Sequence, residues 1–122
     1  MDWREDINKR AIAILRVSSA RQKDNHSHEV QEKEIRSYCE EHGLKLIEVR
    51  RIIESAKNAE NRKQFNDAIA WAAENDCMHL VFHTFDRESR NLSDNEKNES
   101  LIRSGRLIIH YARDRTVFWK DT

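Results

Sequence analysis

The stretch from residue 11 to residue 17 is apolar at nearly every position, and no other feature restricts the fold as strongly. A strand with one face in solvent alternates apolar and polar residues, whereas a continuous apolar run is typical of a central strand covered on both faces. Such strands occur in parallel sheets that carry helices on each side. The sequence therefore predicts an α/β domain with residues 11 to 17 as a core strand.

Helical and extended patterns then alternate along the chain. Residues 28 to 42 predict a helix, with Ser27 as its cap and Gly43 as its C-terminal stop. The alternating run from 44 to 49 predicts a strand at an edge of the sheet.

The next helix is expected to begin at a capping box formed by Asn61 and Gln64 and to end near residue 75. A helical stripe supports this prediction, and its members are Phe65, Ala68, Ile69, Ala72 and Ala73.

The last third of the chain predicts one more helix and the remaining strands. A short polar helix is expected between a capping box at 93 to 96 and Gly105. Strands are expected at 79 to 85, at 107 to 111 and at 116 to 119. The resulting order, βαβαβαββ, predicts a largely parallel sheet.

Length, charge and cysteine content limit the classes of protein. A chain of 122 residues suffices for one domain. Its 22 basic and 22 acidic side chains cancel, so it lacks the positive field of an independent DNA-binding domain, and any contact with nucleic acid must be local. Cys39 and Cys77 lack a CxxC spacing and are expected to be free core thiols of a cytoplasmic protein. We expect neither a signal peptide nor a membrane span.

Two of the predicted strands end in side chains that suit a phosphate. Arg16 and Ser18 lie two residues apart in an extended chain, so their side chains share one face. A later strand leads into residues 86 to 91, where Arg87 and Arg90 share one side of a helical turn. Guanidinium groups clamp tetrahedral phosphates and stabilise the charge that develops during attack by a hydroxyl. The cluster therefore suits a phosphodiester.

Other interpretations of these and further residues need to be weighed. A serine after a strand is usually a turn residue, and an Asp-Arg-x-x-Arg pattern usually begins a solvated helix. With only two glycines, the chain has neither of the glycine-rich nucleotide-binding motifs. His79 and His83 are expected on one face of a strand, and His26 and His28 in a loop. None of them forms a metal-binding motif, so we expect no metal and no cofactor.

Five short motifs together resemble the catalytic domain of the serine recombinases, the resolvase and invertase family. They match this family in order and spacing along residues 11 to 113, and each lies on the expected element. In chain order they are Arg16-Val17-Ser18-Ser19, Gln22, Ser27-His28-Glu29-Val30-Gln31, Glu54-Ser55-Ala56-Lys57 with Arg62, and Asp86-Arg87-Glu88-Ser89-Arg90-Asn91. The resemblance implies a three-layer, resolvase-like α/β domain, with a mostly parallel sheet of four to five strands and helices on both faces.

The same resemblance implies a mechanism and a set of site residues. Ser18 would be the nucleophile that forms a phosphoserine link to a DNA 5′ end and leaves a free 3′ hydroxyl. The ester would keep the bond energy, so neither ATP nor another cofactor would be needed. Arg16, Arg87 and Arg90 would hold the scissile phosphate. Further phosphate-binding or supporting residues would be Arg62, Gln22, Asp86, Glu54 and Gln31.

Three positions depart from the usual pattern of the family. Ile14 replaces a tyrosine, Met78 replaces an acid, and Glu88 replaces the leucine between the two arginines of the last motif. A carboxylate at position 88 could neutralise the phosphate clamp if it points inward. Two alternatives therefore stay open: a catalytically weak relative with an assembly or regulatory role, and a domain that binds a phosphorylated small molecule.

The resemblance also implies partners. They are double-stranded DNA and further copies of the protein, which would form a dimer and then a synaptic tetramer in the full-length protein, away from any membrane. Relatives continue into a dimerisation helix and a DNA-binding domain, so we expect residues 1 to 122 to be the catalytic fragment. The segment from Glu29 to Gly43 resembles the large-recombinase branch, which favours a mobile-element integrase or excisionase partner.

Overall fold

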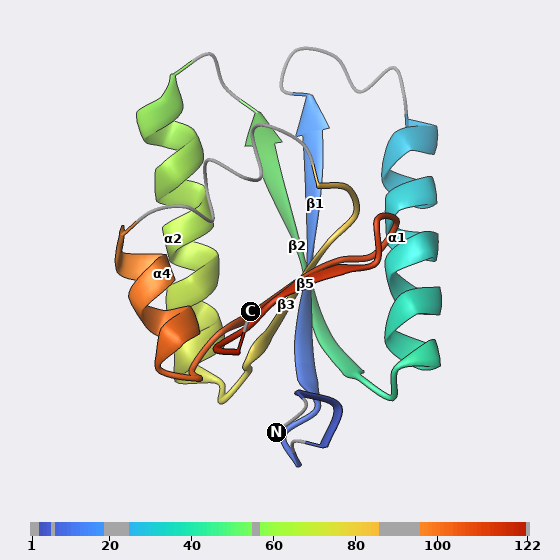
Figure 1. Ribbon diagram of the computed structural model, residues 1–122. Coiled ribbons are helices and arrows are strands. Elements are labelled where there is room, and N and C mark those ends of the chain that lie inside the picture. Colours follow the sequence, from blue (N-terminus) through green and yellow to red (C-terminus); the bar gives the residue numbers. More distant parts are fainter. Residues whose placement is uncertain (1–2, 6, 19–24, 55–56, 86–95, 122) are drawn as a thin grey trace.

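The computed structural model of the protein describes residues 3–5, 7–18, 25–54, 57–85 and 96–121. Within these residues a short 3-10 helix precedes alternating strands and helices (Figure 1), in the predicted order βαβαβαββ. The elements are η1 (Trp3–Glu5), β1 (Arg10–Ser18), α1 (Asn25–Glu41), β2 (Lys45–Glu54), α2 (Asn58–Glu74), β3 (His79–Phe82), α4 (Glu96–Arg103), β4 (Ile108–Tyr111) and β5 (Thr116–Phe118).

The strands form one sheet in the order β2-β1-β3-β4-β5. β1 pairs in parallel with both β2 and β3, and β3 pairs in parallel with β4, while β5 runs antiparallel to β4. The predicted mostly parallel sheet is confirmed. The edge position predicted for the strand at 44 to 49 is also confirmed, although this strand extends to Glu54.

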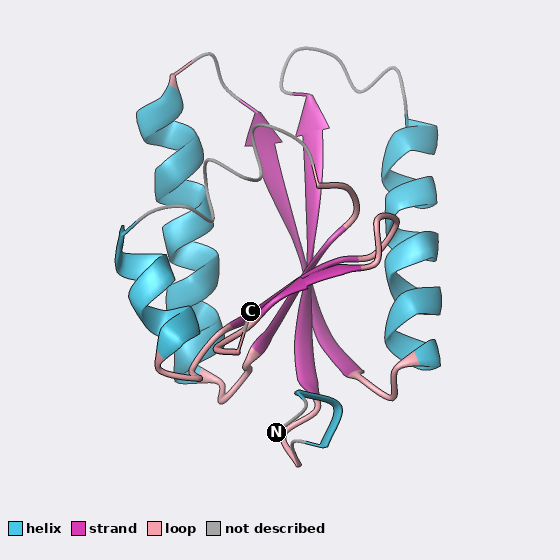
Figure 2. Ribbon diagram, viewed as in Figure 1, coloured by secondary structure: helices cyan, strands magenta, loops and turns pink. Residues whose placement is uncertain are grey.

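Helices cover both faces of the sheet, and alternate residues of β1 pack against them. Ile12 and Ile14 belong to the same buried cluster as Phe65 of α2. Leu15 belongs to a second cluster with Ile35 of α1. Figure 2 shows α1 on one side of the strands and α2 with α4 on the other. Each buried side chain of this size contributes about 1.5–3 kcal/mol relative to exposure, which explains why the apolar run at residues 11 to 17 becomes the interior strand of three layers.

The first α-helix begins earlier than the sequence indicated. α1 starts at Asn25, so Ser27 lies inside the helix and its predicted role as cap is wrong. His26 and His28 are also in α1 and not in a loop. Because the chain has no proline to stop the helix on this side, the polar residues continue it. The predicted stop is confirmed: Gly43 has a φ of 70°, which a residue without Cβ adopts without strain.

The second long helix also begins earlier than predicted. α2 starts at Asn58 after Lys57, which makes no side-chain capping bond. The predicted capping box at Asn61 and Gln64 is therefore wrong, because both residues lie inside the helix. Ala73 is exposed, unlike the other members of the predicted stripe, which are buried: Phe65, Ala68, Ile69 and Ala72.

A buried chain of hydrogen bonds links α1, the sheet and the N-terminal residues. The Tyr38 hydroxyl lies 2.7 Å from His110 Nδ1, His110 Nε2 lies 2.9 Å from His79 Nδ1, and His79 Nε2 lies 3.0 Å from the Asn8 carbonyl oxygen. A carbonyl only accepts, so His79 Nε2 donates to it. A neutral His79 then accepts from His110, which in turn accepts from Tyr38. The Trp3 ring packs against both imidazoles. When both imidazoles are neutral, each of these three hydrogen bonds has one donor and one acceptor.

This histidine pair predicts that the domain loses stability in mild acid. Burial is the main cause that lowers the pKa of His110 well below its ordinary value of 6.5, and the basic side chains of His79, His42 and Arg4 nearby lower it further by disfavouring a proton on His110. Below pH 6.5 the unfolded chain therefore binds more protons than the folded one, and acid favours unfolding. We expect the unfolding free energy to be constant between pH ~7 and ~8 and to fall by up to ~1.4 kcal/mol per pH unit below ~6.5.

Urea unfolding at pH 7.5, 6.0 and 5.0 measures this dependence. The variant His110→Gln removes the titrating group and should have a shallower pH profile, even if it is less stable at every pH. The explanation is wrong if the unmodified protein has the same unfolding free energy at pH 7.5 and pH 5.0.

Candidate active site at the carboxyl ends of β1 and β2

The first two strands extend beyond the third at the carboxyl edge of the sheet. Pairing between β1 and β3 stops at Ile14 and Phe82, whereas pairing between β1 and β2 continues to Ser18 and Glu54. The third strand is thus shorter than predicted and ends at Phe82 instead of residue 85. β1 extends about 13 Å farther, at ~3.3 Å per residue. Ser18 is the last residue of β1, at the edge where α/β sheets place their chemistry.

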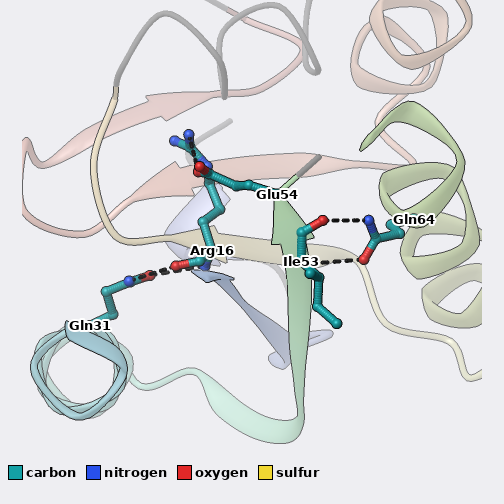
Figure 3. A network of polar contacts seen from close by, with 5 residues as sticks. All are labelled: Arg16, Gln31, Ile53, Glu54 and Gln64. Atoms are coloured by element: carbon teal, nitrogen blue, oxygen red, sulfur yellow. Dashed lines mark hydrogen bonds and ion pairs between the residues drawn. The ribbon is translucent and has the colours of Figure 1, made fainter. Parts of the chain in front are cut away.

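An ion pair joins the ends of these two strands. Arg16 Nη2 lies 2.7 Å from Glu54 Oε1, and the two side chains are 16% and 40% exposed (Figure 3). Glu54 is also the register partner of Ser18. The carboxylate therefore holds the guanidinium beside the end of β1, where the sequence places the candidate nucleophile.

A glutamine of α1 binds the backbone of the same arginine. Gln31 Oε1 accepts a hydrogen bond from Arg16 N at 3.0 Å, and Gln31 Nε2 donates to Arg16 O at 2.9 Å. The N–H and C=O of one strand residue point to the same side, and β3 has already ended at this level. The Gln31 amide thus takes the place of a neighbouring strand (Figure 3) and ties α1 to β1.

A second glutamine binds β2 in the same way. Gln64 of α2 accepts from Ile53 N at 2.8 Å and donates to Ile53 O at 2.7 Å. Sequence reasoning missed this contact because it assigned Gln64 to a capping box. The available signal was the occurrence of one glutamine in each of the two helices that follow β1 and β2.

The other predicted site residues are only partly covered by the structure. Arg62 lies on α2 with an exposed side chain and makes no ion pair with the residues that the structure describes. Ile14, one of the departures from the family pattern, is a core residue that is 1% exposed. Four predicted site residues and the departing glutamate lie outside the described residues: Gln22, Asp86, Arg87, Arg90 and Glu88.

The residues that directly follow β3 are attached to neighbouring elements. The His83 imidazole contacts the Glu34 carboxylate of α1. The Phe85 amide donates to Asp114 Oδ2 at 2.5 Å, in the turn between β4 and β5. These contacts fix the point from which the last arginine-containing motif continues.

Other nucleophiles and metal ligands are poorly placed in the described part of the chain. Cys39 and Cys77 are both buried and free, as predicted, and burial raises the pKa of each thiol to about 11. They are therefore protonated at neutral pH and unreactive. Among the described residues no three His, Cys, Asp or Glu side chains gather into a group able to hold a metal ion. No helix in the described ranges combines the length and apolar character needed to span a bilayer.

Comparisons with known proteins agree with this architecture. Among solved structures, the domain is similar to the N-terminal catalytic domain of TP901-1 integrase, with 16% identity and a TM-score of 0.53 over 89% of this chain and 81% of that chain. At this identity the likeness concerns the fold, and it confirms the predicted resolvase-like class. No curated protein sequence matches the chain. The model of the family described as "Resolvase, N terminal domain" matches residues 11–118, nearly the whole chain. The chain therefore belongs to the resolvase family of serine recombinases.

Proposed function

We propose that this domain cuts and rejoins DNA at specific sites, by transesterification through Ser18. The observation that carries the proposal is the arrangement at the end of β1. Ser18 ends this strand opposite Glu54, and the Glu54 carboxylate fixes the guanidinium of Arg16 at the same edge. Family membership supplies the reaction class.

The proposed reaction exchanges one phosphoester for another. Ser18 Oγ attacks the phosphorus atom, the bond from phosphorus to the DNA 3′ oxygen breaks, and the serine proton passes in net terms to that oxygen. The products are a 5′ phosphoserine and a free 3′ hydroxyl. Attack by a 3′ hydroxyl of a partner strand restores the phosphodiester and releases the serine. Since the number of phosphoester bonds stays constant, the cycle needs no ATP.

The arginines would stabilise the charge on the phosphate. A guanidinium has five N–H donors, so the bond from Arg16 to Glu54 is compatible with a contact to a phosphate oxygen. We assign Arg87 and Arg90 to the same phosphate. This assignment is supported by the adjacent, parallel arrangement of β1 and β3, because the last motif follows the β3 end at this edge.

The partners proposed for the domain follow from the same assignment. They are double-stranded DNA and further copies of the protein, assembled into a dimer and a synaptic tetramer when the whole protein is present. The fold likeness to the TP901-1 integrase domain supports a place in the large-recombinase branch, which would act on a mobile element in the cytoplasm.

The main alternative is a catalytically weak module with an assembly or regulatory role. It is favoured by the ion pair itself, because Glu54 offsets the charge of Arg16 where a phosphate would bind. The small-molecule alternative has less support. A cleft of about 600 Å³ between α1 and the turn after β4 contains Arg113 and Arg115. Arg115 is paired with Glu41, and no predicted site residue within the described ranges lines this cleft.

Covalent trapping tests the proposal. The chain is incubated with a pool of random-sequence duplexes whose central linkage carries sulfur in place of the bridging 3′ oxygen, so that the released thiol rejoins poorly. We expect an SDS-resistant protein–DNA adduct, and mass spectrometry should place the phosphoryl group on Ser18. A folded protein that binds the duplexes without forming an adduct would favour the module. Attachment at another residue would contradict the assignment of the nucleophile.

A further inference from the structure

We propose that Gln64 is a positioning residue for Arg16 and that it acts through the end of β2 and the Glu54 carboxylate. This inference rests on the proposed function, because Arg16 is assigned there to the scissile phosphate. Gln64 does not bond to the described side chains of the ion pair; it binds the backbone of Ile53, the residue that precedes Glu54.

The end of β2 needs a partner on its outer side. β2 is the edge strand of the sheet, so its outer backbone groups face no other strand. Ile53 adds little packing there, because 48% of its side chain is exposed. The Gln64 amide binds both backbone groups of Ile53, at 2.8 and 2.7 Å, and substitutes for the missing strand at one position. This contact restrains the backbone where the strand would otherwise fray.

The restrained position lies directly before the carboxylate that contacts Arg16. Ile53 and Glu54 are consecutive, and Glu54 is the last residue of β2. A change in the backbone direction at Ile53 would move the Glu54 carboxylate away from Arg16 Nη2, which is now 2.7 Å from it. Figure 3 shows this succession from Gln64 through Ile53 and Glu54 to Arg16.

The arginine is thus fixed from two helices by the same device. Gln31 of α1 holds the Arg16 backbone, and Gln64 of α2 holds the strand that orients the Arg16 side chain. The first contact fixes the backbone position of Arg16, and the second fixes the direction of its guanidinium. Small errors in such placement reduce rates strongly when the charged group must meet a developing charge.

The test compares Gln64→Ala and Gln64→Met with Asn66→Ala as a matched control. Asn66 lies on the same helix with an exposed side chain, so its variant removes an amide without touching β2. Gln64→Met keeps most of the length and packing of the side chain, in case the shorter alanine weakens the packing of α2 on β2. We expect both Gln64 variants to fold, to form the Ser18 adduct about tenfold more slowly, and to leave DNA affinity unchanged. Asn66→Ala should match the unmodified protein.

Two further measurements separate positioning from a general structural role. In nitrogen-15 NMR spectra, the Arg16 side-chain signals should show faster guanidinium rotation in both Gln64 variants. In a Glu54→Gln background, Gln64→Ala should slow trapping no further, because the carboxylate through which Gln64 acts is already gone. If Gln64→Ala slows trapping by the same factor in the unmodified protein and in the Glu54→Gln protein, the proposal is overturned.

The failure of this inference and the failure of the proposed function give different results. Faster rotation of the Arg16 guanidinium in the Gln64 variants, combined with no adduct even from the unmodified protein, would support the positioning role and reject the recombinase assignment. Normal trapping and unchanged Arg16 signals in both Gln64 variants would reject the positioning role and keep the recombinase assignment.

Discussion

Replacing Ser18 by alanine is expected to abolish the covalent adduct with DNA while leaving the fold intact. The two cysteines cannot replace Ser18 as the nucleophile, because both are protonated thiols in the core. Removal of a nucleophile reduces turnover by a factor on the order of 10³ or more. The pairing of Ser18 with Glu54 is a backbone interaction, so the unfolding free energy should change by less than ~0.5 kcal/mol.

The phosphorothiolate assay measures this effect, and Ser37→Ala provides the control. Ser37 is an exposed hydroxyl on α1, so its loss should leave the rate of trapping unchanged. A Ser18→Ala protein that still forms an adduct at the normal rate would show that another group attacks the phosphate. In that case the assignment of Ser18 fails, whatever the family.

Replacement of Arg16 by lysine should be nearly as damaging as its removal. A lysine keeps the positive charge but lacks the planar fork that can bind a carboxylate and a phosphate at once. We expect Arg16→Lys and Arg16→Ala each to slow trapping by a factor on the order of 10²–10³. The structural cost should be small, because the Glu54 side chain is 40% exposed and water can hydrate its carboxylate.

Arg10→Lys is the matched control for this experiment. Arg10 begins the same strand at the opposite edge of the sheet, where its Nε donates to the Asn75 carbonyl oxygen. Its replacement should leave trapping unchanged. If Arg16→Lys trapped DNA as fast as the unmodified protein, charge alone would suffice and the proposed geometric role of the guanidinium would be wrong.

The sequence predicted the elements of the fold better than their ends. Ile12 and Leu15 indicate an interior strand because both faces of β1 are apolar, and this signal is local. The start of a helix depends on weaker preferences. Ser27 and Asn61 have side chains suited to caps, but the chain without prolines lets the helices begin earlier.

The candidate site was predictable where a motif carries it and unpredictable where only tertiary contacts do. The positions of Arg16, Ser18 and Glu54 follow from the resemblance to the recombinases, and the structure brings these strand ends together. The contact of Gln64 with Ile53 joins a helix to an edge strand, and the glutamine alone does not identify the strand residue that it binds. The same limit applies to the bond between His79 and His110, which lie in different strands.

The hydrogen-bonded chain that ends at Asn8 also determines where the folding unit begins. The family match starts at residue 11, which suggests the first core strand as a natural boundary. Trp3 nevertheless covers the two buried imidazoles, and the Asn8 carbonyl oxygen is the terminal acceptor for His79. A version trimmed to the family boundary would open the interior to water and leave a buried donor without its acceptor. Trp3 and Asn8 are therefore integral to the packing of this domain, although both precede the boundary of the family match.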